Sequence, residues 1–295
     1  MTRTVIPIPP SFDESGLALQ HDKTSEYVSW LSSQGIDNIM TTAGTSQYNM
    51  MSPEEILYFN ETVATSHSGN KILGIPGYNT SEMKRFLNGV RNLDSKNCSY
   101  LLLYPDRFYD TQTLIDYFKE ASDICESPVY VHDMGMRKGV GGSWEYTADV
   151  INDMYSQGIV KGIKEEHSTL DSAFKFVSKL EKDLDVIVAG GSMRRHYLLR
   201  HAGANAFLGG LGNLLPQAEL DYCKLVDKEH TKEVDFLLEK ETTLFETFMS
   251  FGWHRSLREG ISQLGHGCDY NRKPWPSADS YFKSRIEECL KEVIQ

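Results

Sequence analysis

The chain has 295 residues, of which 40% are hydrophobic, so it carries enough apolar material for a large core and is not disordered. Its 30 basic and 41 acidic side chains give a net charge of −11, and such a surface repels nucleic-acid backbones and anionic lipid. No apolar run approaches the roughly 20 residues that span a bilayer, and the first ten residues do not resemble a secretory signal. We therefore expect a cytoplasmic protein with neither a nucleic-acid nor a membrane partner.

The cysteines and histidines do not form a metal-binding pattern. The five cysteines are scattered, with no CxxC pair, and the nine histidines show neither HxxxH nor HxH spacing. We expect reduced thiols and no metal site.

Short β-branched segments alternate with amphipathic helical segments through the first two thirds of the chain. Helix starts are marked by a capping box at Ser52 and Glu55, with Pro53 between them, and by Asn79 followed by Glu82. Alternating strands and helices are typical of a parallel sheet, because parallel neighbours need a crossover. The eight expected strands are Thr4–Ile8, Ile36–Thr41, Lys71–Ile75, Ser99–Tyr104, Pro128–His132, Ile159–Lys164, Asp185–Ala189 and Asn205–Gly209.

The pattern changes after Pro216, where only helical periodicity remains. Eight strand–helix units before that point fit a closed (β/α)8 TIM barrel better than an open sheet. We predict the barrel over residues 1–216 and a C-terminal helical extension over residues 217–295. The expected helices of the extension are Glu219–Val226, Lys232–Phe251, Ser256–Leu264 and Ser277–Ile294.

Reactive groups of such barrels lie at the carboxyl ends of the strands, and Lys164 ends the sixth one. Its phase with Val160 and Gly162 points it inward, where burial disfavours the ammonium form and frees an amine to attack a carbonyl. The alternative interpretation is a lysine at a strand end whose ammonium simply reaches water.

Other polar residues at strand ends allow two interpretations each. The turn Gly44-Thr45-Ser46 offers hydroxyls and amides that could hold a carboxylate, although such turns occur in every fold. His132, on the same face of its strand as Tyr130, could carry protons or could be structural. Taken by itself, Arg137 is interpreted as a solvated charge in a glycine-rich loop.

Taken in order, these segments and three others resemble one family. Gly162-Ile163-Lys164-Glu165 matches a G-I-K-[ED] strand, and Gly44-Thr45-Ser46 matches a G-T-T or G-S-T loop. The remaining matches are Gly77-Tyr78-Asn79-Thr80, Arg137-Lys138-Gly139, Ala204 to Pro216, and Arg272-Lys273-Pro274. Over nearly its whole length the chain resembles the dihydrodipicolinate synthase / N-acetylneuraminate lyase family of pyruvate-dependent class I aldolases.

The resemblance implies a lyase that forms a Schiff base between Lys164 and pyruvate or another 2-oxo acid, with no separate cofactor. It implies that Thr45 and Ser46 bind the carboxylate and that Leu208 contacts the pyruvate. An aldehyde or a sugar acid would be the other substrate. The same resemblance implies a homotetramer, assembled as a dimer of dimers.

The chain departs from the family pattern at two places and aligns loosely with it at a third. His132 stands where the family has a proton-relaying tyrosine, and Gln47-Tyr48 replaces the usual G-E pair. The tyrosine that members lend across a subunit interface corresponds to Tyr104, with Tyr109 as the alternative. Arg137 resembles the arginine with which synthase-type members bind a distal carboxylate.

Two other functions remain open. A relative that keeps the Schiff base could eliminate water from a sugar acid as a dehydratase, or act as a hydrolase, and His132 would suit such a changed proton transfer. A catalytically silent relative could bind a 2-oxo acid without turnover, which the loss of the tyrosine favours and the retained Lys164 opposes.

Overall fold

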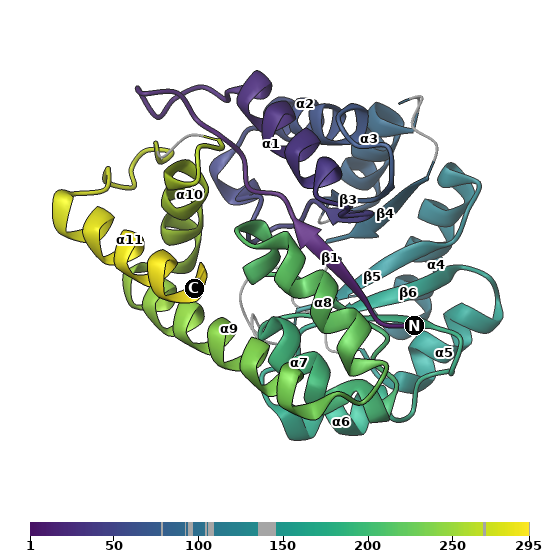
Figure 1. Cartoon of the computed structure of the whole chain (residues 1–295). Helices are drawn as coiled ribbons and strands as arrows, with labels where there is room; N and C mark the ends of the chain where they lie inside the picture. The colour runs from purple at the N-terminus through teal and green to yellow at the C-terminus, as the bar shows by residue number, and fades with distance from the viewer. Residues whose placement is uncertain are drawn as a thin grey trace. The chain divides into compact units, whose positions relative to one another are not determined.

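A computed structural model describes residues 1–77, 79–91, 93, 97–103, 105, 109–134, 146–267 and 270–294. Eight strands follow one another in chain order around a closed barrel, and helices alternate with them (Figure 1). The predicted (β/α)8 fold with C-terminal helices is confirmed. The strands are β1 (Arg3–Pro7), β2 (Asn38–Met40), β3 (Asn70–Ile75), β4 (Cys98–Leu102), β5 (Val129–Asp133), β6 (Val160–Glu165), β7 (Asp185–Val188) and β8 (Ala206–Leu208).

The helices begin close to the expected start signals. Ser52 and Glu55 form the predicted capping box, and the Asn79 side chain accepts a hydrogen bond from the Glu82 amide at 3.0 Å. The helices between strands are α1 (His21–Ser33), α2 (Pro53–Thr65), α3 (Thr80–Val90), α4 (Thr111–Cys125), α5 (Ala148–Ser156), α6 (Leu170–Val177) and α7 (Ser192–Leu199). The later helices are α8 (Pro216–Val226), α9 (Thr231–Phe251), α10 (Trp253–Gln263) and α11 (Ser280–Ile294).

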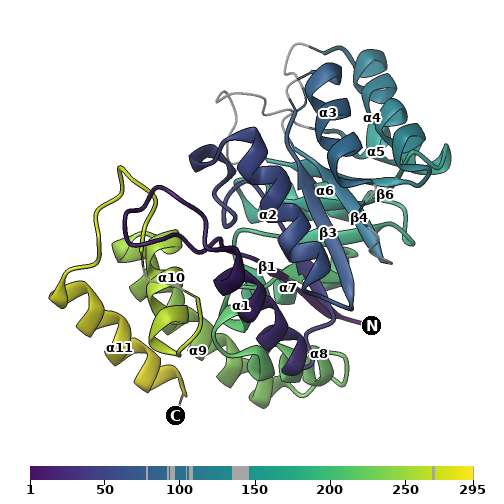
Figure 2. The same cartoon turned by 90° about the horizontal axis from the view of Figure 1, so that it is seen from above.

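The chain forms two compact units, and the first comprises residues 1–71 and 209–295. In this unit β1 pairs in parallel with β2, with Ile6 opposite Ile39. Helices α9, α10 and α11 pack on one another, and α1 lies beside α2 (Figure 2). The sequence-based boundary between residues 216 and 217 coincides with the start of α8 and stays a prediction.

The second unit comprises residues 72–208, and its strands β4 to β8 pair in parallel. These strands are buried along most of their length, and Val131, Ile163 and Ile187 are fully buried. The register places His132 of β5 opposite Lys164 of β6. Both side chains come from buried strands, so their positions are set by the sheet rather than by a loop.

Two glycines that follow helices have a left-handed backbone. Gly35 after α1 has φ of 87° and Gly158 after α5 has φ of 70°, where a residue with a Cβ would be strained. Over the described ranges, no helix has the length and apolarity needed to cross a membrane.

Candidate active site

Lys164 lies in the interior of the second unit, as its phase on β6 predicted. The residue is 2% exposed, and its neighbours in the sheet are His132 on β5 and the apolar Ile187 on β7. Its Nζ lies 2.7 Å from His132 Nε2 and donates a hydrogen bond to Glu166 Oε2 at 2.6 Å. The amine is therefore held between an imidazole and a carboxylate.

Glu166 is a site residue that the sequence analysis missed. It follows the last residue of β6, and its Oε2 also lies 2.9 Å from His132 Nε2. Burial would raise the pKa of this carboxyl, but the positive charge of Lys164 and the hydrogen bond from His132 outweigh burial and hold the pKa well below its usual range. The side chain is 24% exposed, so the cluster of Lys164, His132 and Glu166 has one member that reaches solvent.

A second charged cluster adjoins the first and is built around Glu165. Arg195 on α7 donates to both carboxylate oxygens of Glu165, at 2.7 and 3.1 Å. His167 lies between two buried carboxylates, with Nδ1 3.0 Å from Glu165 Oε1 and Nε2 3.2 Å from Asp133 Oδ2. This cluster joins the end of β5, the end of β6 and α7.

The charges in the second cluster reinforce one another. Burial would lower the pKa of His167, but the contacts with Glu165 and Asp133 outweigh burial and raise it. Burial would also raise the pKa of Glu165, yet the hydrogen bonds from His167 and Arg195 lower it. We infer that Glu165 is a structural anion that anchors the end of the lysine strand, in contrast to the partly exposed Glu166.

The loop after β2 in the first unit carries Thr45 and Ser46. The Ser46 hydroxyl donates to the Ile8 carbonyl at 2.6 Å and accepts from the Thr42 amide at 3.0 Å. Its one hydroxyl proton is thus used to hold the loop against β1. Thr45, at 7% exposure, is the other hydroxyl of this turn, and carboxylate binding by either residue stays a prediction.

The departure at Gln47 has a partner far along the chain. Gln47 Oε1 accepts a hydrogen bond from the buried guanidinium of Arg258 on α10, at 2.6 Å. Arg258 also donates to the Pro10 carbonyl. A helix of the C-terminal region therefore holds this loop, which sequence reasoning did not find.

The remaining predicted site residues lie on β8 or between β4 and β6. Tyr104 and Arg137 lie outside the described residues. Tyr109 stacks at a tilt on Tyr117, with ring centroids 5.8 Å apart. Leu208 ends β8 and is partly exposed. Gly209 follows it in the chain.

Gly209 and its neighbours are held by a buried carboxylate. Glu219 on α8 accepts hydrogen bonds from the amides of Gly210 and Gly212, at 2.8 and 2.7 Å, and from the Thr4 hydroxyl at 2.5 Å. A Cβ at position 209 would lie 2.8 Å from the Thr4 hydroxyl oxygen and closer still to this carboxylate. Any side chain at position 209 would therefore displace its neighbours in the first unit.

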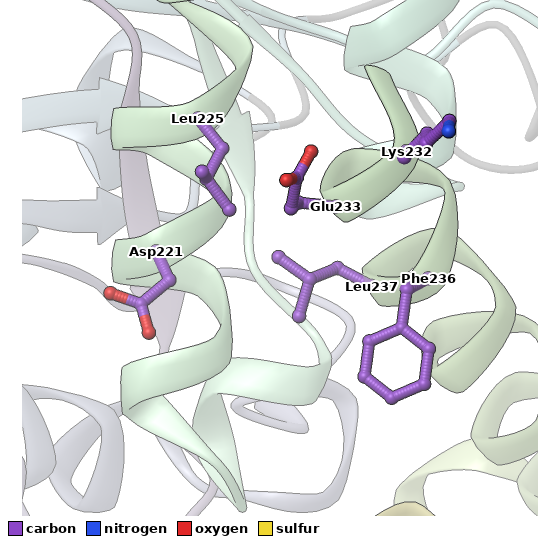
Figure 3. A pocket seen from close by; sticks show the side chains of 6 residues that line it. All are labelled: Asp221, Leu225, Lys232, Glu233, Phe236 and Leu237. Atoms are coloured by element: carbon purple, nitrogen blue, oxygen red, sulfur yellow. The ribbon is translucent and has the colours of Figure 1, made fainter. Parts of the chain in front are cut away.

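A shallow groove of about 360 Å³ lies in the first unit, between α8 and α9 (Figure 3). Asp221 and Leu225 line one side, and Phe236 and Leu237 line the other. Lys232 and Glu233 also line the groove, and none of the lining residues stands at the carboxyl end of a strand. Among the described residues, no group of three or more histidine, cysteine or acidic side chains is placed to hold a metal ion.

Comparison with protein families matches residues 1–293 to the Dihydrodipicolinate synthetase family. The chain belongs to this family. The expected resemblance is confirmed, and membership supports a carbon–carbon lyase of the pyruvate-dependent class I aldolase type. No curated protein matches the chain.

Solved structures of family members share the fold over their whole length. Dihydrodipicolinate synthase from Bacillus clausii is 20% identical, with a TM-score of 0.83, and the alignment covers 100% of this chain and 98% of that one. Proteus mirabilis N-acetylneuraminate lyase is 14% identical, with a TM-score of 0.83 and coverage of 99% and 98%. YagE from E. coli K12, solved in complex with pyruvate, is 14% identical, with a TM-score of 0.85 and coverage of 99% and 98%.

Proposed function

We propose that the protein is a class I lyase that forms or cleaves a C–C bond through an imine between Lys164 and pyruvate or a related 2-oxo acid. The observation that carries this proposal is the buried Lys164 amine, 2.7 Å from an imidazole nitrogen. A lysine on a buried strand with a base in contact is suited to attack a carbonyl. The family's pyruvate-bound member YagE supports the choice of ligand.

Imine formation needs a proton to leave Lys164 and a proton to reach the departing oxygen. His132 Nε2 lies where it can accept the first, which converts the ammonium to an amine and the imidazole to an imidazolium. The amine then adds to the keto carbon, and a second proton moves from the nitrogen of the adduct to its oxygen, which gives a carbinolamine. The imidazolium protonates the hydroxyl of this carbinolamine, which leaves as water. Overall, an ammonium and a ketone give a protonated imine and one water, so atoms and charge balance.

The protonated imine withdraws electrons from the neighbouring carbon, and a C–C bond to an aldehyde or sugar-acid fragment can form or break there. In this proposal His132 moves the proton at that carbon as well. The carboxylate of the 2-oxo acid binds at Thr45 and Ser46, and Leu208 contacts its apolar end. Tyr104 as a proton relay and Arg137 as the ligand of a distal carboxylate complete the proposal, both from the family resemblance.

Borohydride reduction in the presence of pyruvate tests the proposal. The wild-type protein should gain the mass of one reduced pyruvate adduct, on the peptide that contains Lys164. The matched variant Lys164→Arg keeps the positive charge beside Glu166 and should gain none. Absence of a wild-type adduct across a panel of 2-oxo acids would refute the Schiff base.

A dehydratase that uses the same imine is the second candidate. The observation in its favour is the pairing of His132 with Glu166, because an imidazolium held by a carboxylate can deliver a proton to a leaving hydroxyl. Counting the carbons of the products separates the two activities, since an aldolase divides the carbon skeleton and a dehydratase retains it. A silent binding protein would release no product, and a hydrolase would add water to the fragments that it releases.

A further inference from the structure

One nitrogen of His132 faces both other members of the Lys164 cluster. Nε2 lies 2.7 Å from Lys164 Nζ and 2.9 Å from Glu166 Oε2. An imidazole nitrogen either carries a proton and donates, or lacks one and accepts. It cannot accept from Lys164 and donate to Glu166 at the same time.

Two placements of one proton satisfy this geometry. In the first, Lys164 is an ammonium that donates to Glu166 and to an unprotonated Nε2. In the second, Lys164 is a neutral amine, and the imidazolium of His132 donates from Nε2. Glu166 Oε2 contacts the cation in both placements, at 2.6 Å for Lys164 and 2.9 Å for His132. The carboxylate therefore attracts the proton to the pair without fixing it on either nitrogen.

The other carboxylates at the ends of β5 and β6 contact cationic or imidazole side chains of the second cluster. Glu165 is bound by Arg195 and His167, and Asp133 faces the opposite nitrogen of His167. The residue opposite Lys164 on β7 is the apolar Ile187. Glu166 is a carboxylate in contact with both members of the Lys164–His132 pair.

We propose that Glu166 is the positioning residue of this site, retaining one mobile proton on the Lys164–His132 pair. This proposal rests on the proposed function for its use in catalysis, because the retained proton is the one that leaves Lys164 and later protonates the departing oxygen. Glu166 itself forms no bond to substrate in this scheme. In this scheme His132 and Glu166 together carry out the proton transfer for which, by the resemblance, the family uses a tyrosine.

The test is the pH dependence with which Lys164 reacts with a small amine reagent, without any 2-oxo acid present. Trace acetylation by acetic anhydride is measured on the Lys164 peptide by mass spectrometry over a range of pH. For each variant, the midpoint is the pH at which the acetylation rate of Lys164 reaches half of its maximum. Glu166→Gln keeps the size of the side chain but removes its charge. We expect its midpoint to fall by about 1 pH unit or more, because a carboxylate in contact favours the charged form of its partner by about that amount.

Two further variants make the result specific. Glu166→Asp retains the charge and should recover at least part of the shift, which a merely structural role would not produce. Asp171→Asn removes an exposed carboxylate that pairs with Lys175 on α6 and should leave the midpoint unchanged. A midpoint in Glu166→Gln equal to that of the wild type would overturn the proposal.

The outcome does not depend on whether the protein is a lyase. A shifted midpoint in a protein that forms no borohydride adduct would sink the proposed function and leave the proton-holding role of Glu166 standing. An unshifted midpoint in a protein that does form the adduct would remove Glu166 from the mechanism and leave the Schiff base intact.

Discussion

Buried charged side chains at the ends of β5 and β6 lie beside opposite charges, and this arrangement sets their energetics. Removing one partner of such a pair leaves the other charge buried and unpaired. The resulting loss in the free energy of unfolding is larger than the net stabilisation that the intact pair provides. Glu166 differs from the rest because a quarter of its side chain reaches solvent. The pairs are Lys164 with Glu166, Arg195 with Glu165, and His167 with both Glu165 and Asp133.

Arg195 is the clearest test of the buried Glu165 cluster. Arg195→Met removes two hydrogen bonds from the fully buried Glu165 carboxylate and should lower the free energy of unfolding by about 3–5 kcal/mol. Urea unfolding at neutral pH measures this loss. Lys175→Met breaks an exposed pair with Asp171 and should cost at most about 1 kcal/mol. Equal losses in the two variants would contradict the role given to Glu165.

The raised pKa of His167 makes the free energy of unfolding depend on pH in a predictable direction. Its folded-state pKa is raised above the ordinary value of 6.5, so the folded protein holds this proton more tightly than the unfolded chain. The stabilisation is complete below pH 6.5 and is lost as pH rises through the folded-state pKa. The difference in unfolding free energy between wild type and His167→Gln should therefore be larger at pH 6 than at pH 9. A difference that grows with pH would reverse the assignment.

At the scale of elements, the close pairing of β5 with β6 depends on a glycine. A Cβ on Gly162 would lie 2.6 Å from the Asp185 carbonyl oxygen and closer still to the ring of Tyr130. The Tyr130 hydroxyl in turn donates to Asp185 at 2.5 Å. The glycine of the lysine strand is thus required by packing between β5, β6 and β7.

Gly162→Ala should lower the free energy of unfolding by about 1–3 kcal/mol, since the added methyl group must displace a ring and a backbone carbonyl. Thermal unfolding followed by circular dichroism measures the effect. Gly44→Ala is the matched control, because its Cβ would meet only the His254 ring at 3.7 Å, an ordinary contact. A larger loss at position 44 than at 162 would contradict this account of the strand packing.

The elements were largely predictable from the sequence, and the contacts between distant elements were not. All eight strands were found, because each is a short buried segment between helix signals. Glu166 was missed because its meaning depends on the register that sets His132 beside Lys164. Arg258 was missed for a related reason, since its partner Gln47 lies 211 positions away in the chain.

For the whole molecule, the acidic charge bears on substrate binding, and the exposed apolar side chains bear on assembly. The net charge of −11 opposes an anionic substrate, so under the proposed function local groups must bind the 2-oxo acid against the overall field. Among the aromatic residues of the C-terminal helices, Phe248 is fully buried and packs on Trp253 within the chain. Leu170 and Phe174 on α6 and Leu198 on α7 are instead 45%, 49% and 54% exposed.

The homotetramer stays a prediction, and the exposed residues of α6 and α7 supply an apolar face for it, because these two helices adjoin each other. Sedimentation at micromolar concentration should show a tetramer, and Leu198→Glu should shift it toward smaller species. A monomer in the wild-type protein would contradict the assembly and, with it, a tyrosine borrowed from a neighbouring subunit.

The central claim is that Lys164 forms a covalent imine with a 2-oxo acid. The most direct measurement is a crystal structure of the wild-type protein soaked in pyruvate. We predict continuous electron density from Lys164 Nζ to the keto carbon, with His132 and Glu166 still in contact with each other. Pyruvate bound elsewhere, or bound beside an unmodified Lys164, would contradict the account.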